Sequence, residues 1–340
     1  MEKRESTIDI MKGIGILLVI AGHTNLDNIS KHVIMSFHMP LFFIIAGYLY
    51  KPNCNYWTKL RKDFKRLIVP YLLTSLITMF TYLIISDNYH SIIIHFAKAI
   101  FHADTEDHTS LIWAHVSKIG PIWFLFALFW CRISYNLIHC ILPSRKYLII
   151  ILISITAVIV DRYIINLPFS ILPGLSSMIF YLIGDFIHHN GISMRLIFIC
   201  ALCWITHLLF SEIDMCICLY KIYPIDICGA VFGTTVIYFV SRLCMQFLIL
   251  SNIFSYFGRI SLIILCAHTF EWSFNIQNRL ADQIWVISFF TEVIICILLS
   301  LLWINLKYIA LSFLEKNNFT SSSFPKPHNK IQKREQVGGK

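Results

Sequence analysis

The stretch DIMKGIGILLVIAGH, residues 9–23, decides the fold. It begins with Asp9 and Lys12, continues through apolar residues and glycines, and ends on a single imidazole at His23. Roughly 20 predominantly apolar residues are needed for a helix to cross a hydrocarbon core of about 30 Å. We therefore expect a first membrane span near 8–26. Lys12 and His23 share one face of it, about 16 Å apart along the axis, and Asp9 lies within about 40° of that face.

The composition of the whole chain is typical of a membrane protein. Hydrophobic residues make up 57% of the 340 residues, charged residues only 14%, and the mean hydropathy is +0.69, which does not suit a water-facing surface. The sequence predicts an all-α, polytopic helix bundle whose membrane domain covers residues 1–310. We expect about ten spans, near 8–26, 33–50, 67–85, 120–142, 147–165, 172–188, 194–210, 226–249, 255–272 and 284–306. The segment 91–101 is too short to span and favours an interfacial or re-entrant helix.

The distribution of positive charge predicts the orientation. With the N-terminus inside, 21 of the 28 Lys and Arg residues fall on the inner side and six on the outer side. Positive residues concentrate on the cytoplasmic side of membrane proteins, so we expect both termini in the cytoplasm and the chain in the cell (inner, cytoplasmic) membrane. The net charge of +9 then reflects topology and contact with anionic lipid heads, and excludes nucleic acid as a partner. Residues 311–340 are expected to form a disordered basic tail.

Histidines inside spans allow two interpretations. A lone imidazole often only hydrogen-bonds to a neighbouring helix, whereas ionisable residues within a span usually face a cavity or pathway. The alignment of His23 with Lys12, and a second imidazole at His38 in the next span, favour the cavity. Small residues near the His23 face let another helix approach closely, namely Gly13, Gly15 and Gly22. Most cysteines lie in spans as small apolar side chains, and Cys200-x-x-Cys203 has no second pair, so no metal is expected.

Several segments together resemble the acyltransferase 3 family of integral-membrane O-acyltransferases, especially its sugar O-acetylase branch with the fucose 4-O-acetylase-like proteins. The resemblance rests on residues 9–23, SFHMPLFFIIAGYLY at 36–50, KRLIVPYL at 65–72, GPIWFL at 120–125 and FGRISLIILCAH at 257–268. It implies a ten-helix bundle that takes an acyl group from cytoplasmic acyl-CoA, with acetyl-CoA the expected donor. The implied acceptor is a hydroxyl of an extracytoplasmic sugar or polysaccharide, free or lipid-linked.

The resemblance also implies roles for particular residues. His23 would be the general base, since the pKa of an unperturbed imidazole suits proton transfer near neutral pH. His38 and His268 would complete the catalytic site, with the oxyanion stabilised by His38, His268 or Trp123. The donor side is assigned to Asp9, Lys12, Arg66 and Trp123, with Lys62 and Lys65 as further cations near the CoA phosphates. Trp123 equally fits an interfacial aromatic belt.

Two departures limit this transfer of roles. Many relatives carry an Arg-Arg-x-x-Arg cluster before the third span, and only Arg66 maps onto it cleanly here. A glutamate-rich motif found in the fourth span of some relatives is absent. Arg132 and Glu292 are charges inside spans without an assigned role, expected to snorkel or to pair with each other. The alternative function is a secondary transporter or polysaccharide flippase, although the sequence shows no internal repeat.

Overall fold

The computed structural model describes residues 6–85, 88–103, 118–163, 167–274 and 284–321, with side chains up to Ile309. One compact unit extends to Ile297 and contains the residues of the candidate site. A second unit begins at Leu298, within the last helix. The predicted tail, 311–340, begins within that helix, and residues 322–340 lie outside the described part of the chain. The boundary between membrane domain and tail stays a prediction.

Almost all described residues are helical, which confirms the all-α fold class. The described residues outside helices form turns, connections and one antiparallel pair of two-residue strands between α11 and α12. In chain order the elements are α1 (Ser6–Gly22), α2 (Asn28–Met35), α3 (His38–Tyr48), α4 (Tyr56–Asp63), the π-helical segment η1 (Phe64–Ile68), α5 (Val69–Ile85), α6 (Tyr89–His102), α7 (Trp123–Ile141), the 3-10 turn η2 (Pro143–Arg145), α8 (Lys146–Tyr163), α9 (Ile171–Ser176), α10 (Met178–Asn190), α11 (Met194–Phe210), β1 (Ile213–Asp214), β2 (Leu219–Tyr220), α12 (Tyr223–Cys244), α13 (Leu248–Arg259), α14 (Ser261–Ser273) and α16 (Trp285–Ser321).

Within the described residues, seven helical stretches are long and apolar enough to cross a membrane. An eighth is added if the bent pair α13 and α14 counts as one span, and α11 is a shorter apolar helix. The chain is therefore a multi-pass membrane protein. The total of ten spans and the cytoplasmic position of both termini stay predictions. The segment predicted at 91–101 is indeed a short helix, α6, of 14 residues.

Three of the expected continuous spans are divided. The stretch predicted at 172–188 divides at Ser177 into α9 and α10, and the other two carry residues of the predicted site. The stretch predicted at 33–50 divides into α2 and α3 at Ser36 and Phe37. Pro40 explains this break, because a proline ring collides with the carbonyl four residues earlier, here that of Ser36. The stretch predicted at 255–272 divides into α13 and α14, whose axes meet at 69°. These two breaks place a histidine of the predicted site on the second helix of the broken pair.

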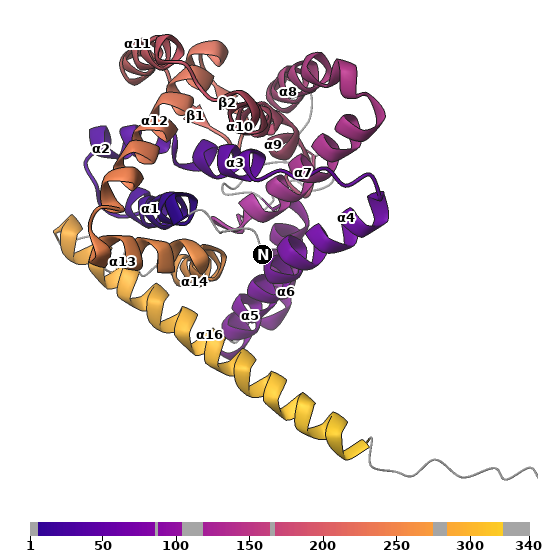
Figure 1. Ribbon diagram of the computed structural model, residues 1–340. Helices are drawn as coiled ribbons and strands as arrows, with labels where there is room; N and C mark the ends of the chain where they lie inside the picture. The colour runs from indigo at the N-terminus through magenta and orange to yellow at the C-terminus, as the bar shows by residue number, and fades with distance from the viewer. Residues whose placement is uncertain (1–5, 86–87, 104–117, 164–166, 275–283, 322–340) are drawn as a thin grey trace, which may run out of the picture. The chain divides into compact units, whose positions relative to one another are not determined.

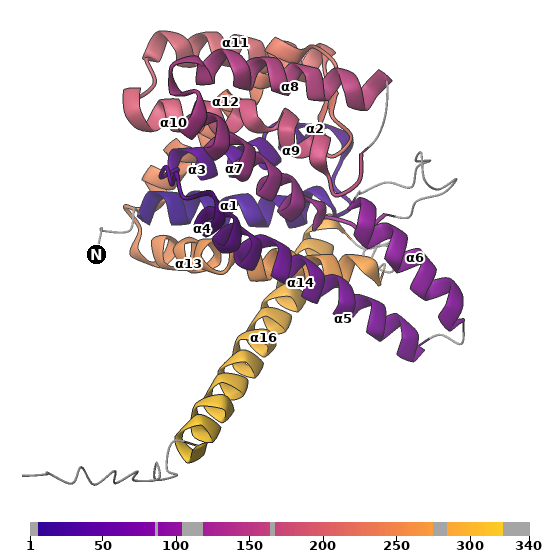
Figure 2. The same cartoon turned by 90° about the vertical axis from the view of Figure 1, so that its right-hand side faces the viewer.

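Helix α1 lies between α3 and α13 in both views of the ribbon (Figure 1, Figure 2). Its contact with α13 brings two backbones together, because a Cβ at Gly13 would lie 2.0 Å from the carbonyl oxygen of Phe254. On α13, a Cβ at Gly258 would lie 1.7 Å from the carbonyl oxygen of Asp9. Close packing of this kind is typical of small residues at membrane helix interfaces. The prediction that Gly13 permits a close approach is confirmed.

Candidate active site

Two of the three predicted catalytic histidines lie side by side. His23 follows the last residue of α1, where its backbone N–H donates to the carbonyl of Ile20 at 3.0 Å, and its side chain is half-buried. His268 lies on α14 and is fully buried. The two ring centroids are 5.3 Å apart, with the planes tilted by 42°. Residues separated by most of the chain therefore form one imidazole pair.

A carboxylate holds His268 in place. Nδ1 of His268 lies 3.0 Å from Oε2 of Glu271, which is three residues further along α14. Neither side chain is exposed. The Nδ1 hydrogen is thus used by Glu271, while Nε2 has no hydrogen-bond partner among the residues that the structure describes. A carboxylate in this position fixes the orientation of the ring and stabilises the imidazolium that forms when the ring takes a proton.

The third predicted histidine, His38, is the first residue of α3 and is buried. Its Nδ1 lies 3.1 Å from the carbonyl oxygen of Ile34 and donates to it. His38 is close enough to His23 to interact with it electrostatically. In the neutral ring Nε2 is then an acceptor, so the predicted oxyanion role of His38 requires the charged ring.

Glu271 was not among the residues predicted from the sequence. Its signal was present, because a residue three positions after His268 in a helix lies on the same face. Glu292, on α16, is also fully buried, and neither of its carboxylate oxygens has a partner within the described chain. The expected pairing of Glu292 with Arg132 is wrong, because Arg132 bonds to Asp63 through Nη2 at 2.9 Å and Nε at 3.1 Å.

The Arg132–Asp63 pair belongs to a charged network at the start of the span formed by α4, η1 and α5. Lys59 Nζ lies 2.8 Å from the other carboxylate oxygen of Asp63, and all three side chains are largely buried. Directly after Asp63, the chain adopts the π-helical segment that carries Lys65 and Arg66. Isolated π-helical turns are frequent at functional sites. The donor-binding role of Arg66 stays a prediction.

The residues of the predicted donor side are spread over α1, α4, the π-helical segment and α7. Asp9 is buried and Lys12 half-buried on α1, whereas Lys62, Lys65 and Arg66 are exposed. Trp123 is the first residue of α7 and is only 4% exposed. A belt residue faces lipid at the membrane surface, so its burial excludes that interpretation of Trp123.

A second polar network joins α7 to α10. Asp185 accepts from Tyr135 at 2.6 Å and from Lys146 at 2.9 Å. Burial raises the pKa of the neighbouring Tyr50, and the negative charge of Asp185 adds to the effect. Close by, a disulfide between Cys54 and Cys140 joins the connection after α3 to the end of α7.

A second histidine–carboxylate pair lies between α11 and α12. His207 Nδ1 is 2.8 Å from Oδ1 of Asp226, which also accepts from Ser211 and from the backbone N–H of Ile222. The ring of His207 stacks on that of His32 with centroids 5.5 Å apart. Asp226 is fully buried and satisfied by these donors, so the pair holds the connection between the two helices in place.

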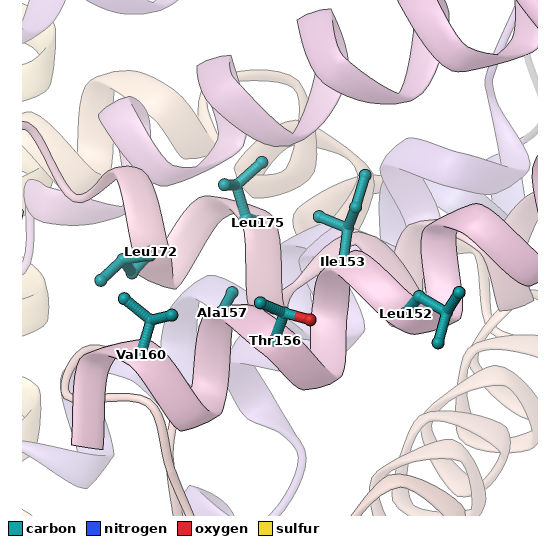
Figure 3. A pocket seen from close by; sticks show the side chains of 7 residues that line it. All are labelled: Leu152, Ile153, Thr156, Ala157, Val160, Leu172 and Leu175. Carbon is teal, nitrogen blue, oxygen red and sulfur yellow. The ribbon is translucent and has the colours of Figure 1, made fainter. Parts of the chain in front are cut away.

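Two apolar hollows in the described part of the chain do not contain these histidines. One, of about 210 Å³, lies between α8 and α9, and Figure 3 shows its lining, in which Thr156 supplies the only side-chain oxygen. Another, of about 250 Å³, is lined by α1, α12, α13 and the first turns of α16. Neither offers the acid–base groups that a group-transfer reaction needs. The candidate active site is therefore the histidine cluster itself.

Fold and site together define an integral-membrane protein with a buried acid–base centre of imidazoles and a carboxylate. The model of the acyltransferase 3 family, described as an acyltransferase domain, matches residues 5–308. The chain belongs to this family and is a membrane acyltransferase. No curated protein and no solved structure matches it.

Proposed function

We propose that this protein transfers an acetyl group from cytoplasmic acetyl-CoA to a hydroxyl of an extracytoplasmic sugar or polysaccharide, free or lipid-linked. This places it in the sugar O-acetylase branch, with the fucose 4-O-acetylase-like proteins. The observation that carries the proposal is the contact between His23 and His268. Their ring centroids are 5.3 Å apart, and Glu271 holds the ring of His268.

The positions of Lys12 and His23 along α1 support transfer through the membrane. His23 lies at one end of α1 and Lys12 eleven residues earlier on the same face, which separates them by about 16 Å along the axis. A cation at the cytoplasmic mouth neutralises CoA phosphate, and an extended acyl-pantetheine arm covers the distance to the imidazoles. Arg66, on the π-helical segment, supplies a second cation, and Asp9 and Trp123 complete the donor side.

The reaction needs a base and a stabiliser of negative charge. His23 takes the proton of the acceptor hydroxyl while the hydroxyl oxygen attacks the thioester carbonyl carbon. The carbonyl oxygen becomes an oxyanion, to which His268 donates from Nε2 when its ring is charged and paired with Glu271. Collapse of the intermediate breaks the C–S bond, forms the acetyl ester, and releases the CoA thiolate, which receives the proton from His23. His38 adds a second donor when its ring is charged.

The test uses the purified protein in lipid with radiolabelled acetyl-CoA and the surface polysaccharide of the expressing cells. We expect label to appear as alkali-labile acetyl ester, with one free CoA thiol released per ester formed. Release of thiol without labelled polysaccharide would contradict the proposed acceptor. An intact thioester throughout would contradict acyl transfer from acetyl-CoA.

A further inference from the structure

The structure brings a second carboxylate to the His268–Glu271 pair. Glu292, near the start of α16, is fully buried and interacts electrostatically with Glu271. One helical turn further along α16, Cys296 lies beside the same pair. A ring nitrogen of His268, a carboxylate oxygen of Glu271 and Sγ of Cys296 all lie within 4.8 Å of one another. We call Glu271 and Glu292 the carboxylate pair.

The charge of the carboxylate pair is not balanced if both members are ionised. Glu271 has the imidazole of His268 as its partner, whereas no Lys or Arg side chain of the described residues bonds to Glu292. An ionised carboxylate without a partner in a low-dielectric interior costs several kcal/mol. Two neighbouring carboxylates avoid this cost by sharing one proton, as the dyad of aspartic proteases does.

We propose that Glu292 carries this proton and acts as a positioning residue for His268. Its carboxylic acid donates a hydrogen bond to Oε1 of Glu271, directly or through a water molecule, and Oε1 has no other partner among the described residues. Glu271 is then held with Oε2 toward Nδ1 of His268. The inference rests on the proposed acetyl transfer, because it explains how the oxyanion donor of that reaction is kept in place.

A neutral Glu292 also sets the charge that the reacting atoms meet. Glu271 and an imidazolium at His268 cancel, so the developing oxyanion faces no net negative charge. A second ionised carboxylate would oppose the oxyanion. Glu271 of α14 and Cys296 of the same helix interact electrostatically with Glu292. His268 lies beside both of these groups, and His23 of α1 lies beside His268.

A pair of substitutions at position 292 tests the role of the proton. Glu292→Leu removes the donor, and we expect kcat to fall about 10- to 100-fold, the effect of losing one hydrogen bond to a charged group, with KM for acetyl-CoA unchanged. Glu292→Gln is always neutral and still donates, so it should recover most of that loss. Glu212→Leu, the same chemical change at an exposed position between α11 and β1, is the matched control and should keep wild-type kcat. A Gln variant as impaired as the Leu variant would overturn the proposal.

Two further measurements do not depend on turnover. The infrared spectrum of the wild-type protein should contain the carbonyl band of a protonated carboxylic acid, and Glu292→Gln should lose it. If that band is absent or survives the substitution, Glu292 does not carry the proton. The cluster also holds the N, O and S donors that suit Zn²⁺. Equimolar zinc in the purified protein, lost in Cys296→Ala, would replace the shared proton by a metal and overturn the proposal.

These outcomes separate the inference from the proposed function. A wild-type protein that transfers no acetyl group contradicts the proposed function, while the infrared band still decides whether Glu292 is protonated. A wild-type protein that transfers acetyl, combined with a Gln variant that fails to recover, contradicts only the role of Glu292.

Discussion

Substituting glutamine for His23 tests the base directly. The glutamine amide keeps a similar size and hydrogen-bonding capacity but takes no proton at neutral pH. A positioned general base contributes about 10²- to 10⁴-fold to a rate. At 1.36 kcal/mol for each tenfold change, this is about 2.7 to 5.4 kcal/mol of transition-state stabilisation. The side chain is half-buried, and the hydrogen bond from His23 to the last turn of α1 comes from its backbone N–H. We therefore expect His23→Gln to lower kcat by at least about 10²-fold and leave thermal stability near wild type.

The assay compares ester formation from radiolabelled acetyl-CoA by wild type and variant in the same lipid. His90→Gln is the matched control, because it makes the same chemical change at an exposed position on α6. Calorimetric binding of CoA should be unchanged in both variants, since His23 acts about 16 Å from the cytoplasmic mouth. If the His23→Gln protein keeps most of its acetyl transfer, His23 is not the base and serves only in packing.

The same assay separates the roles of the two imidazoles. Glutamine at position 268 still donates a hydrogen bond, so His268→Gln should keep more activity than His268→Leu if this residue stabilises the oxyanion. If His268→Gln is as inactive as His268→Leu while His23→Gln keeps partial activity, the base is His268 and the assignment of the two roles is reversed.

Three more outcomes are expected. Changing both Lys12 and Arg66 to glutamate should raise KM for acetyl-CoA at least as much as it lowers kcat, because phosphate contacts exist in ground and transition states alike, and unchanged calorimetric CoA binding would place the donor site elsewhere. Asp63→Ala leaves the buried cations of its network without a partner and should lower the free energy of unfolding by about 3–5 kcal/mol, seen as an earlier thermal transition; an unshifted transition would mean that the network adds no stability. Cys54 and Cys140 form a disulfide in the structure but lie on the side predicted to be cytoplasmic, where disulfides are rare. In intact cells we therefore expect this bond to be reduced, so that a membrane-permeant maleimide labels both thiols and an impermeant one does not. Labelling from outside would reverse the predicted orientation, and no labelling by either reagent would mean that the disulfide persists.

Much of the helical framework could be predicted from the sequence. Apolar stretches of membrane-spanning length directly reflect the solvent they must match, and most helices appear where these stretches lie. The close approach of α13 to α1 at Gly13 could also be anticipated, because small residues mark such contacts. Even the break before His38 had a local cause in Pro40, which the hydropathy of the stretch concealed.

The partners of the buried charges could not be predicted. Arg132 bonds to Asp63 and not to Glu292, because pairing between spans depends on which helices become neighbours, and no spacing along the chain encodes that. Glu271 was recoverable, since it lies one helical turn from His268. The contact of His23 with His268 required the fold itself, because it joins the end of α1 to the second half of a helix bent by 69°.

Transfer of acetyl groups across the membrane can be measured in proteoliposomes that hold acetyl-CoA on the cytoplasmic side and the polysaccharide on the other. We expect labelled acetyl ester to accumulate on the polysaccharide while an equal amount of free CoA thiol appears on the donor side, and His23→Ala to stop both. Movement of a sugar or lipid-linked sugar across the membrane with the thioester intact would contradict this expectation and identify a transporter.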